Sequence, residues 1–303
     1  MSQAAIQLKT SRGVVEYLDV GSGTPILYFH GTGAGCDAAV LLEESLISAC
    51  CRLIVPNRSG YYGTALMQPG SVEHCVVQSA ELLDHLGIRR AAVMGTSGGG
   101  MPAGRFAANY PDLATCLILQ CSQAHRWDSG IWLPKGLEKT LFLFRLSMFR
   151  AFLRWETRRC AKVAGHNPMV CLKEMSGSRF SEIADDKEVV GQIAQLTKMS
   201  LACARRLNGV ENDWDILLGD NGIQPGMVER PTMIIHDRAD PLVPFCHAEW
   251  SKTCIPHAEP LDVHLGGHLI WFGDKFSSVH QTRVNFVRNN SEDIGPASSE
   301  RRS

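Results

Sequence analysis

The chain has 303 residues, of which 45% are hydrophobic and 20% charged, enough for one large core with an insertion or for two small domains. Thirty basic and 31 acidic residues give a net charge of −1, which excludes a global attraction to nucleic acid or to an anionic membrane. We therefore expect a small-molecule substrate, no nucleic-acid partner and no stable membrane insertion.

Cysteine usage and the N-terminus indicate the compartment. The 11 cysteines show no Cys-x-x-Cys pair or other zinc-ligand spacing, which indicates buried thiols in a reducing compartment. Met1–Gly13 lacks the apolar segment of a secretion signal, and no run of uncharged apolar residues is long enough to span a bilayer. We expect a cytoplasmic protein with no metal and no cofactor.

The first part of the chain predicts strands that alternate with helices. A turn rich in Gly and Pro is expected to join two strands, Val14–Val20 and Ile26–His30, into an antiparallel hairpin at a sheet edge. The next predicted elements are a strand at Leu53–Val55, a helix at Val72–Leu86, a strand at Ala91–Gly95, a helix at Gly98–Tyr110 and a strand at Thr115–Cys121. This alternation predicts a mostly parallel sheet with helices on both faces.

The pattern becomes helical between Gln123 and Arg230, and the strands then resume. Strands are predicted at Thr232–His236 and Leu261–Leu265, followed by a closing helix at Lys275–Arg288. We therefore divide the chain into a first core part (1–122), an inserted helical cap (123–230), a second core part (231–290) and a polar, disordered tail (291–303).

A nucleophile motif follows the predicted strand at Ala91–Gly95. Gly95-Thr96-Ser97-Gly98-Gly99 fits Gly-x-Ser-x-Gly, in which a sharp strand-to-helix turn strains the serine backbone and the glycines avoid collisions. Amides at the start of the following helix would face the Ser97 oxygen and stabilise an oxyanion. Taken alone, the motif also fits a glycine-rich loop that binds phosphate or merely turns the chain.

A serine nucleophile needs a histidine base and a carboxylate that orients it. Asp240 and His268 are the candidates, because each follows a predicted strand in the second core part. Loops after parallel strands open at one sheet edge, the edge expected for Ser97. Asp237 is a competing acid, three residues before Asp240.

Five separated motifs resemble the α/β-hydrolase superfamily: His30-Gly31-Thr32-Gly33, Asn57 to Gly63, the turn at Ser97, the Asp240 loop, and Gly266-Gly267-His268. The resemblance implies an α/β-hydrolase fold, in which helices flank a mostly parallel central sheet and a helical cap is inserted. It implies the triad Ser97, Asp240 and His268. It also implies an oxyanion hole made by the backbone N–H groups of Thr32 and Gly98, with His30, Gly31 and Gly33 as a supporting loop.

The chain departs from the family pattern at two positions. Asn57 replaces a frequent aspartate in a structural turn, so we expect catalysis to be unaffected. Asp237 stands where glycine is usual, but the distance of Asp240 from the strand end and the Pro-x-Val-Pro after it match the family's acid loop. We therefore prefer Asp240 as the triad acid.

The most amphipathic stretch, Leu137–Trp155, has three interpretations: a cap helix over the site, a helix at a membrane surface, or the interface of a homodimer. The cap interpretation predicts a largely apolar pocket.

The resemblance and the triad predict a serine hydrolase that cleaves carboxylic esters or related acyl compounds of small, largely apolar substrates through an acyl-enzyme. A C–C bond hydrolase, a lactonase and an aminopeptidase-like hydrolase are alternatives on the same triad. The aminopeptidase would need an acidic pocket, for which Glu156, Glu174, Asp213 and Asp215 are candidates. A small-molecule receptor with little turnover is the alternative from another class.

Overall fold

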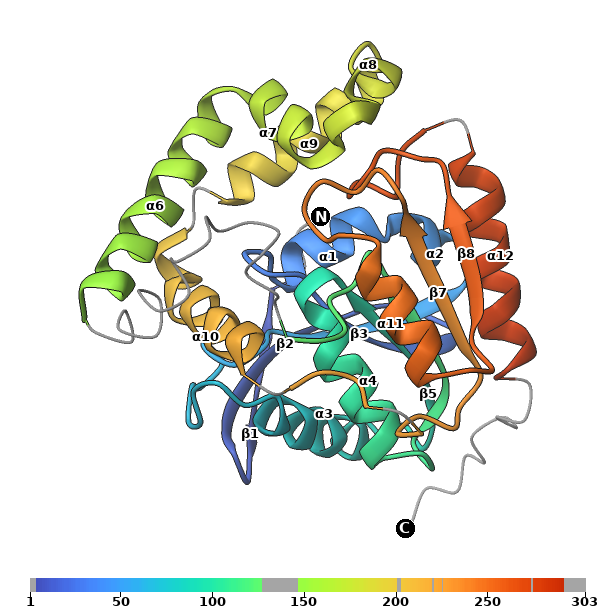
Figure 1. Cartoon of the computed structure of the whole chain (residues 1–303). Helices are drawn as coiled ribbons and strands as arrows, with labels where there is room; N and C mark the ends of the chain where they lie inside the picture. Colours follow the sequence, from blue (N-terminus) through green and yellow to red (C-terminus); the bar gives the residue numbers. More distant parts are fainter. Residues whose placement is uncertain are drawn as a thin grey trace.

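A computed structural model describes residues 4–126, 147–200, 203–219, 221–224, 226–273 and 275–291 (Figure 1). An eight-stranded sheet forms its centre, in the order β1-β2-β4-β3-β5-β6-β7-β8. The strands are β1 (Ile6–Thr10), β2 (Gly13–Gly21), β3 (Thr24–Phe29), β4 (Cys51–Pro56), β5 (Ala91–Thr96), β6 (Ala114–Gln120), β7 (Thr232–Asp237) and β8 (Glu259–Val263).

From β4 to β8 the sheet is parallel throughout, and β2 joins β4 and β1 by antiparallel pairing. The predicted strands after Leu53 are confirmed, with ends shifted by a few residues. Because parallel strands end at the same edge, the residues that follow β3, β5, β6, β7 and β8 meet at one edge of the sheet.

The predicted hairpin between Val14–Val20 and Ile26–His30 is wrong. β4 lies between β2 and β3, with Tyr17 opposite Pro56 on one side and Ile26 opposite Leu53 on the other. The apolar centre of β4, Leu53 to Val55, is fully buried and needs a neighbouring strand on each side. β2 forms its hairpin with β1 instead, a strand that the polar N-terminus did not predict.

Helices cover both faces of the sheet, as predicted (Figure 1). α1 (Cys36–Leu42), α2 (Glu44–Ser48) and α12 (Phe276–Asn289) lie on one face, and α3 (Glu73–His85), α4 (Gly100–Asn109) and α11 (Cys246–Cys254) lie on the other. Neighbouring strand residues point to opposite faces, so Ile26 packs in the first cluster and Leu27 in the second. The two clusters form the core that positions the sheet edge.

Between β6 and β7 the described residues form helices: α6 (Ser147–His166), α7 (Pro168–Ser176), α8 (Phe180–Ile183), α9 (Lys187–Ser200) and α10 (Leu207–Leu218). We call them the helical region. In Figure 1, α7, α8 and α9 lie beyond the ends of the strands, and Leu172 and Ile193 join the first core cluster. Residues 137–146 of the amphipathic stretch lie outside the described residues, as do residues 292–303 of the predicted tail.

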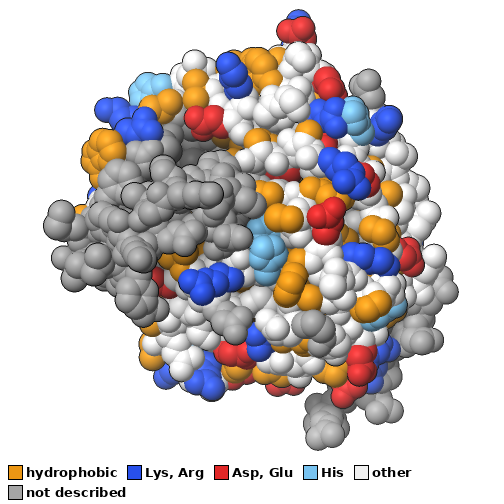
Figure 2. Space-filling view, viewed as in Figure 1, with side chains coloured by type: hydrophobic (Ala, Val, Ile, Leu, Met, Phe, Trp, Pro, Cys, Tyr) orange, Lys and Arg blue, Asp and Glu red, His pale blue; other side chains and the backbone are white. Residues whose placement is uncertain are grey.

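None of the described helices is long and apolar enough to cross a lipid bilayer. Acidic and basic side chains are interspersed on the described part of the face in Figure 2, in agreement with the net charge of −1.

Candidate active site

Ser97 lies at the turn between β5 and α4, where the 3₁₀ turn η1 (Ser97–Gly99) begins. Its φ is 52°, a conformation that is strained for a residue with a side chain. A Cβ on Gly95 would lie 2.5 Å from Ala103 Cβ, and a Cβ on Gly99 would lie 2.1 Å from the Phe29 carbonyl oxygen. The strained turn that the motif predicts is therefore present, and only glycine fits on either side of it.

His268 and Asp240 meet at the same edge of the sheet. His268 Nδ1 lies 2.8 Å from Asp240 Oδ2, and both side chains are buried. Asp240 Oδ1 accepts hydrogen bonds from the backbone N–H groups of Leu242 (2.8 Å) and Val243 (2.9 Å). Burial raises the pKa of Asp240. The His268 ring lowers it, as do the His236 ring and the hydrogen bond from the Val243 N–H, and the net result is a pKa below the ordinary value. The carboxylate is therefore ionised, fixed in place and directed at His268.

Cys121, directly after β6, is a site residue that sequence reasoning missed. Its buried thiol lies beside the His268 ring and the Ser97 backbone. Burial lowers the pKa of His268, but Cys121 and Asp240 raise it, and the result is well above the ordinary value. Burial raises the pKa of the Cys121 thiol. A single cysteine after an apolar strand has no sequence signal that separates it from a core residue.

Ser97 and His268 are not joined by a hydrogen bond among the described residues. Such catalytic hydrogen bonds are often long in a free enzyme and shorten when substrate binds. Asp240 and His268 are in direct contact. Ser97 lies at the same edge of the sheet, and Cys121 lies beside both the Ser97 backbone and the His268 ring.

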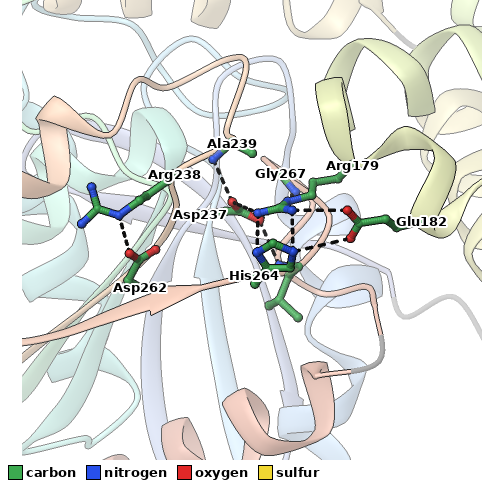
Figure 3. Close-up of polar contacts among 9 residues, drawn as sticks. Arg179, Glu182, Asp237, Arg238, Ala239, Asp262, His264 and Gly267 are labelled. Atoms are coloured by element: carbon green, nitrogen blue, oxygen red, sulfur yellow. Dashed lines mark hydrogen bonds and ion pairs between the residues drawn. The ribbon is translucent and has the colours of Figure 1, made fainter.

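The carboxylate of Asp237 contacts backbone N–H groups and the side chain of Arg179 (Figure 3). Asp237 Oδ1 accepts from the N–H of Ala239 (2.8 Å), and Oδ2 accepts from the N–H groups of Leu265 (2.9 Å) and Gly267 (3.3 Å). Asp237 therefore ties the backbone before His268 to the end of β7. This geometry favours Asp240 over Asp237 as the partner of the histidine.

The turn after α7 contacts the same loop from the helical region. Arg179 Nη2 lies 3.4 Å from Asp237 Oδ1, and its terminal nitrogens also contact the His264 ring and Glu182 (Figure 3). The backbone N–H of His268 donates to the Met175 carbonyl oxygen at 3.0 Å. The helical region thus helps to hold the loop that carries His268.

Thr32, in the loop after β3, lies against Gly98. A Cβ on Gly98 would lie 2.2 Å from Thr32 Oγ1 and 3.3 Å from Thr32 N. A Cβ on Gly31 would lie 3.2 Å from Ser97 Cβ. Thr32 and Gly98 are therefore close together beside Ser97.

Gly33, the next residue of this loop, is hydrogen-bonded at both of its backbone polar groups. Its N–H donates to Tyr61 Oη (2.9 Å), and its carbonyl oxygen accepts from Arg206 Nη1 (2.9 Å). Tyr61 Oη donates to Asp213 Oδ2 (2.7 Å), and Asp213 forms a buried ion pair with Arg58 (2.5 Å). Asp213 lies within α10, and Arg206 directly precedes this helix. The helical region therefore also holds the loop that carries Thr32.

His30 and Asn57 both form buried hydrogen bonds with neighbouring segments. The N–H of Arg58 donates to His30 Nε2 (3.0 Å), and His30 Nδ1 lies 2.9 Å from the Gly31 carbonyl oxygen. Burial lowers the pKa of His30 well below its ordinary value, so the ring is neutral. Asn57 accepts from the N–H of Cys36 (2.9 Å) and donates to Glu16 (3.1 Å).

Two clusters of described residues bring three metal-binding atoms within 4.8 Å of one another. One contains Cys121, Asp240 and His268, already described. In the other, the rings of His125 and His247 are stacked 4.0 Å apart at 19°, near Cys246. In the first cluster His268 Nδ1 and Asp240 Oδ2 contact each other at 2.8 Å, and in the second His247 Nδ1 accepts from the N–H of Ala124 at 3.2 Å.

A model of the alpha/beta hydrolase fold matches residues 24–274. The uncharacterized hydrolase YcgS of Bacillus subtilis is 26% identical over 288 residues, which cover 91% of this chain and 95% of that protein. A 2-hydroxy-6-oxononadienedioate/2-hydroxy-6-oxononatrienedioate hydrolase of a Pseudomonas species is 24% identical over 239 residues, 77% of each protein. The solved structure of an alpha/beta hydrolase fold protein from Nakamurella multipartita has a TM-score of 0.75 and 24% identity, and covers 94% of this chain and 99% of that one.

Proposed function

Because the chain belongs to the alpha/beta hydrolase fold family, we propose that it is a serine hydrolase of carboxylic esters or related acyl compounds. The observation that carries the proposal is the 2.8 Å contact of His268 with Asp240 at the sheet edge that also holds Ser97. The strained backbone of Ser97, with a φ of 52°, supports it independently, because such strain concentrates at functional sites.

In the proposed reaction, Ser97 Oγ attacks the acyl carbon while His268 takes its proton. The carbonyl electron pair moves onto oxygen, which accepts hydrogen bonds from the backbone N–H groups of Gly98 and Thr32. His268 then protonates the leaving alcohol, and the C–O bond breaks to leave an acyl-enzyme. Water gives a proton to His268 as its oxygen bonds to the acyl carbon, and the bond from that carbon to Ser97 Oγ then breaks. Ser97 Oγ takes the proton back from His268, the acid is released, and Asp240 keeps the histidine in the required tautomer throughout.

We expect small, largely apolar substrates, because the amphipathic stretch at Leu137–Trp155 is rich in aromatic side chains. An aminopeptidase-like activity would have to use an acid other than Asp213. Asp213, one of the acids considered for an amine pocket, is buried against Arg58 and Tyr61, so its charge is already neutralised.

A C–C bond hydrolase is the second candidate. The relative from Pseudomonas, a hydrolase of 2-hydroxy-6-oxo dienedioates, favours it. The same three groups, a serine, a histidine and an oxyanion hole, would serve a ketone carbonyl as well as an ester carbonyl.

The compartment that we propose is the cytoplasm. The cysteines whose side chains the structure describes are all free thiols, a state typical of a reducing environment.

A substrate panel tests the proposal. We would compare p-nitrophenyl esters of increasing acyl length with a 2-hydroxy-6-oxo dienoic acid, using the wild type, Ser97→Ala and His268→Ala. We expect the wild type to prefer the esters and both variants to lose most turnover. Preference for the dienoic acid would move the C–C hydrolase to first place, and turnover that survives Ser97→Ala would contradict both.

A further inference from the structure

Gln123 is a buried polar residue at the sheet edge to which the proposed mechanism gives no role. It follows β6, and its side chain is almost fully buried, with 7% of the residue exposed. Its backbone N–H donates to the Ser97 carbonyl oxygen at 3.0 Å. The backbone of Gln123 is therefore fixed directly against the residue proposed as nucleophile.

The Gln123 side chain extends toward the proposed oxyanion hole. Its Oε1 lies 3.4 Å from the point that a Cβ on Gly98 would occupy, and Thr32 Oγ1 and Thr32 N lie close to the same point. Oε1 is buried and has no hydrogen-bond partner in the structure. A buried polar atom without a partner is destabilising, so the Gln123 carboxamide has unused hydrogen-bonding capacity beside Gly98.

Either end of this carboxamide fits the same space. The oxygen and the NH₂ group of glutamine are nearly identical in shape, so a half-turn about the terminal bond replaces an acceptor with a donor. Because Oε1 has no partner, that half-turn breaks no hydrogen bond at the oxygen. A developing negative charge beside Gly98 would favour the orientation that presents Nε2–H.

We propose that Gln123 is a third oxyanion-hole donor, in addition to the backbone N–H groups of Gly98 and Thr32. The proposal rests on the serine-hydrolase function proposed above. When Ser97 Oγ bonds to the acyl carbon, the carbonyl pair moves onto oxygen, and Gln123 Nε2–H donates to it. When the leaving group departs, the pair returns to form the carbonyl, and the donor is released.

Two substitutions test the proposal. Gln123→Met keeps the length of the side chain and removes the donor, and Gln123→Glu replaces the donor with an oxygen. We expect Gln123→Met to lower kcat by about tenfold to a hundredfold, the lower range for loss of one oxyanion-hole donor. KM should change by less than about threefold, because the contact forms only in the transition state.

Gln78→Met is the matched control. Gln78 is also buried, its Oε1 also has no partner, and its Nε2 donates to the carbonyl oxygens of Arg12 and Val14, away from the site. We expect this control to keep the wild-type kcat. Gln123→Glu adds a second readout, since its kcat relative to the wild type should rise as the pH falls and the carboxyl group regains a proton to donate.

Inhibition by a trifluoromethyl ketone separates a donor from a merely structural residue. Its adduct with Ser97 carries an oxyanion, so its inhibition constant should rise in Gln123→Met by the factor that kcat/KM falls. A kcat within about twofold of the wild type, or a rise in KM alone, would overturn the proposal. If the wild type shows no hydrolysis that depends on Ser97, the proposed serine-hydrolase function fails as well. If the wild type is active and the Gln123 variants are unaffected, only the proposed role of Gln123 fails.

Discussion

The carbonyl oxygen of Gly33 accepts a hydrogen bond of 2.9 Å from the Arg206 guanidinium. The N–H of the same glycine donates to Tyr61, which in turn donates to Asp213. The loop that carries Thr32 is thus held through residues at the start of α10 and within it, far away in the sequence. The position of the proposed oxyanion hole therefore depends on how the helical region packs on the sheet.

Tyr61→Phe tests this dependence. It leaves the Gly33 N–H without its acceptor and removes one donor from Asp213, so we expect a loss of about 1–3 kcal/mol in the free energy of unfolding. We also expect kcat to fall by about tenfold, because small misplacements of catalytic groups are costly. Urea denaturation and steady-state kinetics measure the two effects. Tyr17→Phe, at another buried tyrosine, is the control, and equal kinetics in both variants would contradict the dependence.

Gly98→Ala should inactivate the enzyme without unfolding it. The added Cβ would lie 2.2 Å from Thr32 Oγ1, so Thr32 must shift and the two N–H groups lose their alignment. We expect kcat to fall by about a hundredfold or more. Because the collision is mainly with the threonine hydroxyl, Thr32→Ala in the same chain should recover part of the loss. Full activity in Gly98→Ala would show that Thr32 is not held against Gly98.

The two neighbouring aspartates should behave differently. Asp240→Asn removes the carboxylate from His268 and should lower kcat by about 10⁴-fold, the scale known for this change in a serine triad. Asp237→Asn weakens the contacts with Ala239, Leu265 and Gly267 and should mainly lower stability, measured as the melting temperature. A larger loss of kcat in Asp237→Asn would show that Asp237 is the catalytic acid.

The pH dependence of kcat/KM should follow His268, which acts as a base only when neutral. Burial lowers the pKa of His268, but Cys121 and Asp240 raise it above the ordinary value of 6.5. Activity should therefore be lost below this raised pKa and increase as the pH rises through it. A wild-type midpoint below 6.5 would contradict this account of the site.

The sequence predicted every strand except β1, the turn at Ser97, and the proximity of Asp240 and His268. The strands follow from apolar periodicity, and the turn follows from the Gly-x-Ser-x-Gly motif. The proximity of Asp240 and His268 follows from the rule that loops after parallel strands share one edge, and the preference for Asp240 over Asp237 came from the resemblance to the family's acid loop. The position of β4 between β2 and β3 was not predictable in this way, because proximity in the sequence favours a hairpin. The burial of both faces of β4 explains why this strand lies between two others and not at an edge.

Long-range contacts explain the rest of what the sequence did not predict. Arg206 donates to the Gly33 carbonyl oxygen, and Asp213 accepts from Tyr61, the residue that accepts from the Gly33 N–H. Well over a hundred residues separate Arg206 from Gly33 and Asp213 from Tyr61, and no spacing rule connects such positions. Cys121 and Gln123 looked like ordinary residues at the end of a strand. The fold brings the His268 ring to Cys121 and the backbone of Gly98 to Gln123, and no local pattern predicts either contact.

Labelling with a fluorophosphonate tests the central claim, that Ser97 is an activated nucleophile, most directly. Intact mass spectrometry of the wild type, Ser97→Ala and His268→Ala would follow the reaction. We predict a single adduct on the wild type that maps to Ser97, none on Ser97→Ala and very slow labelling of His268→Ala. Folded wild-type protein that stays unlabelled, or an adduct that persists in Ser97→Ala, would contradict the claim.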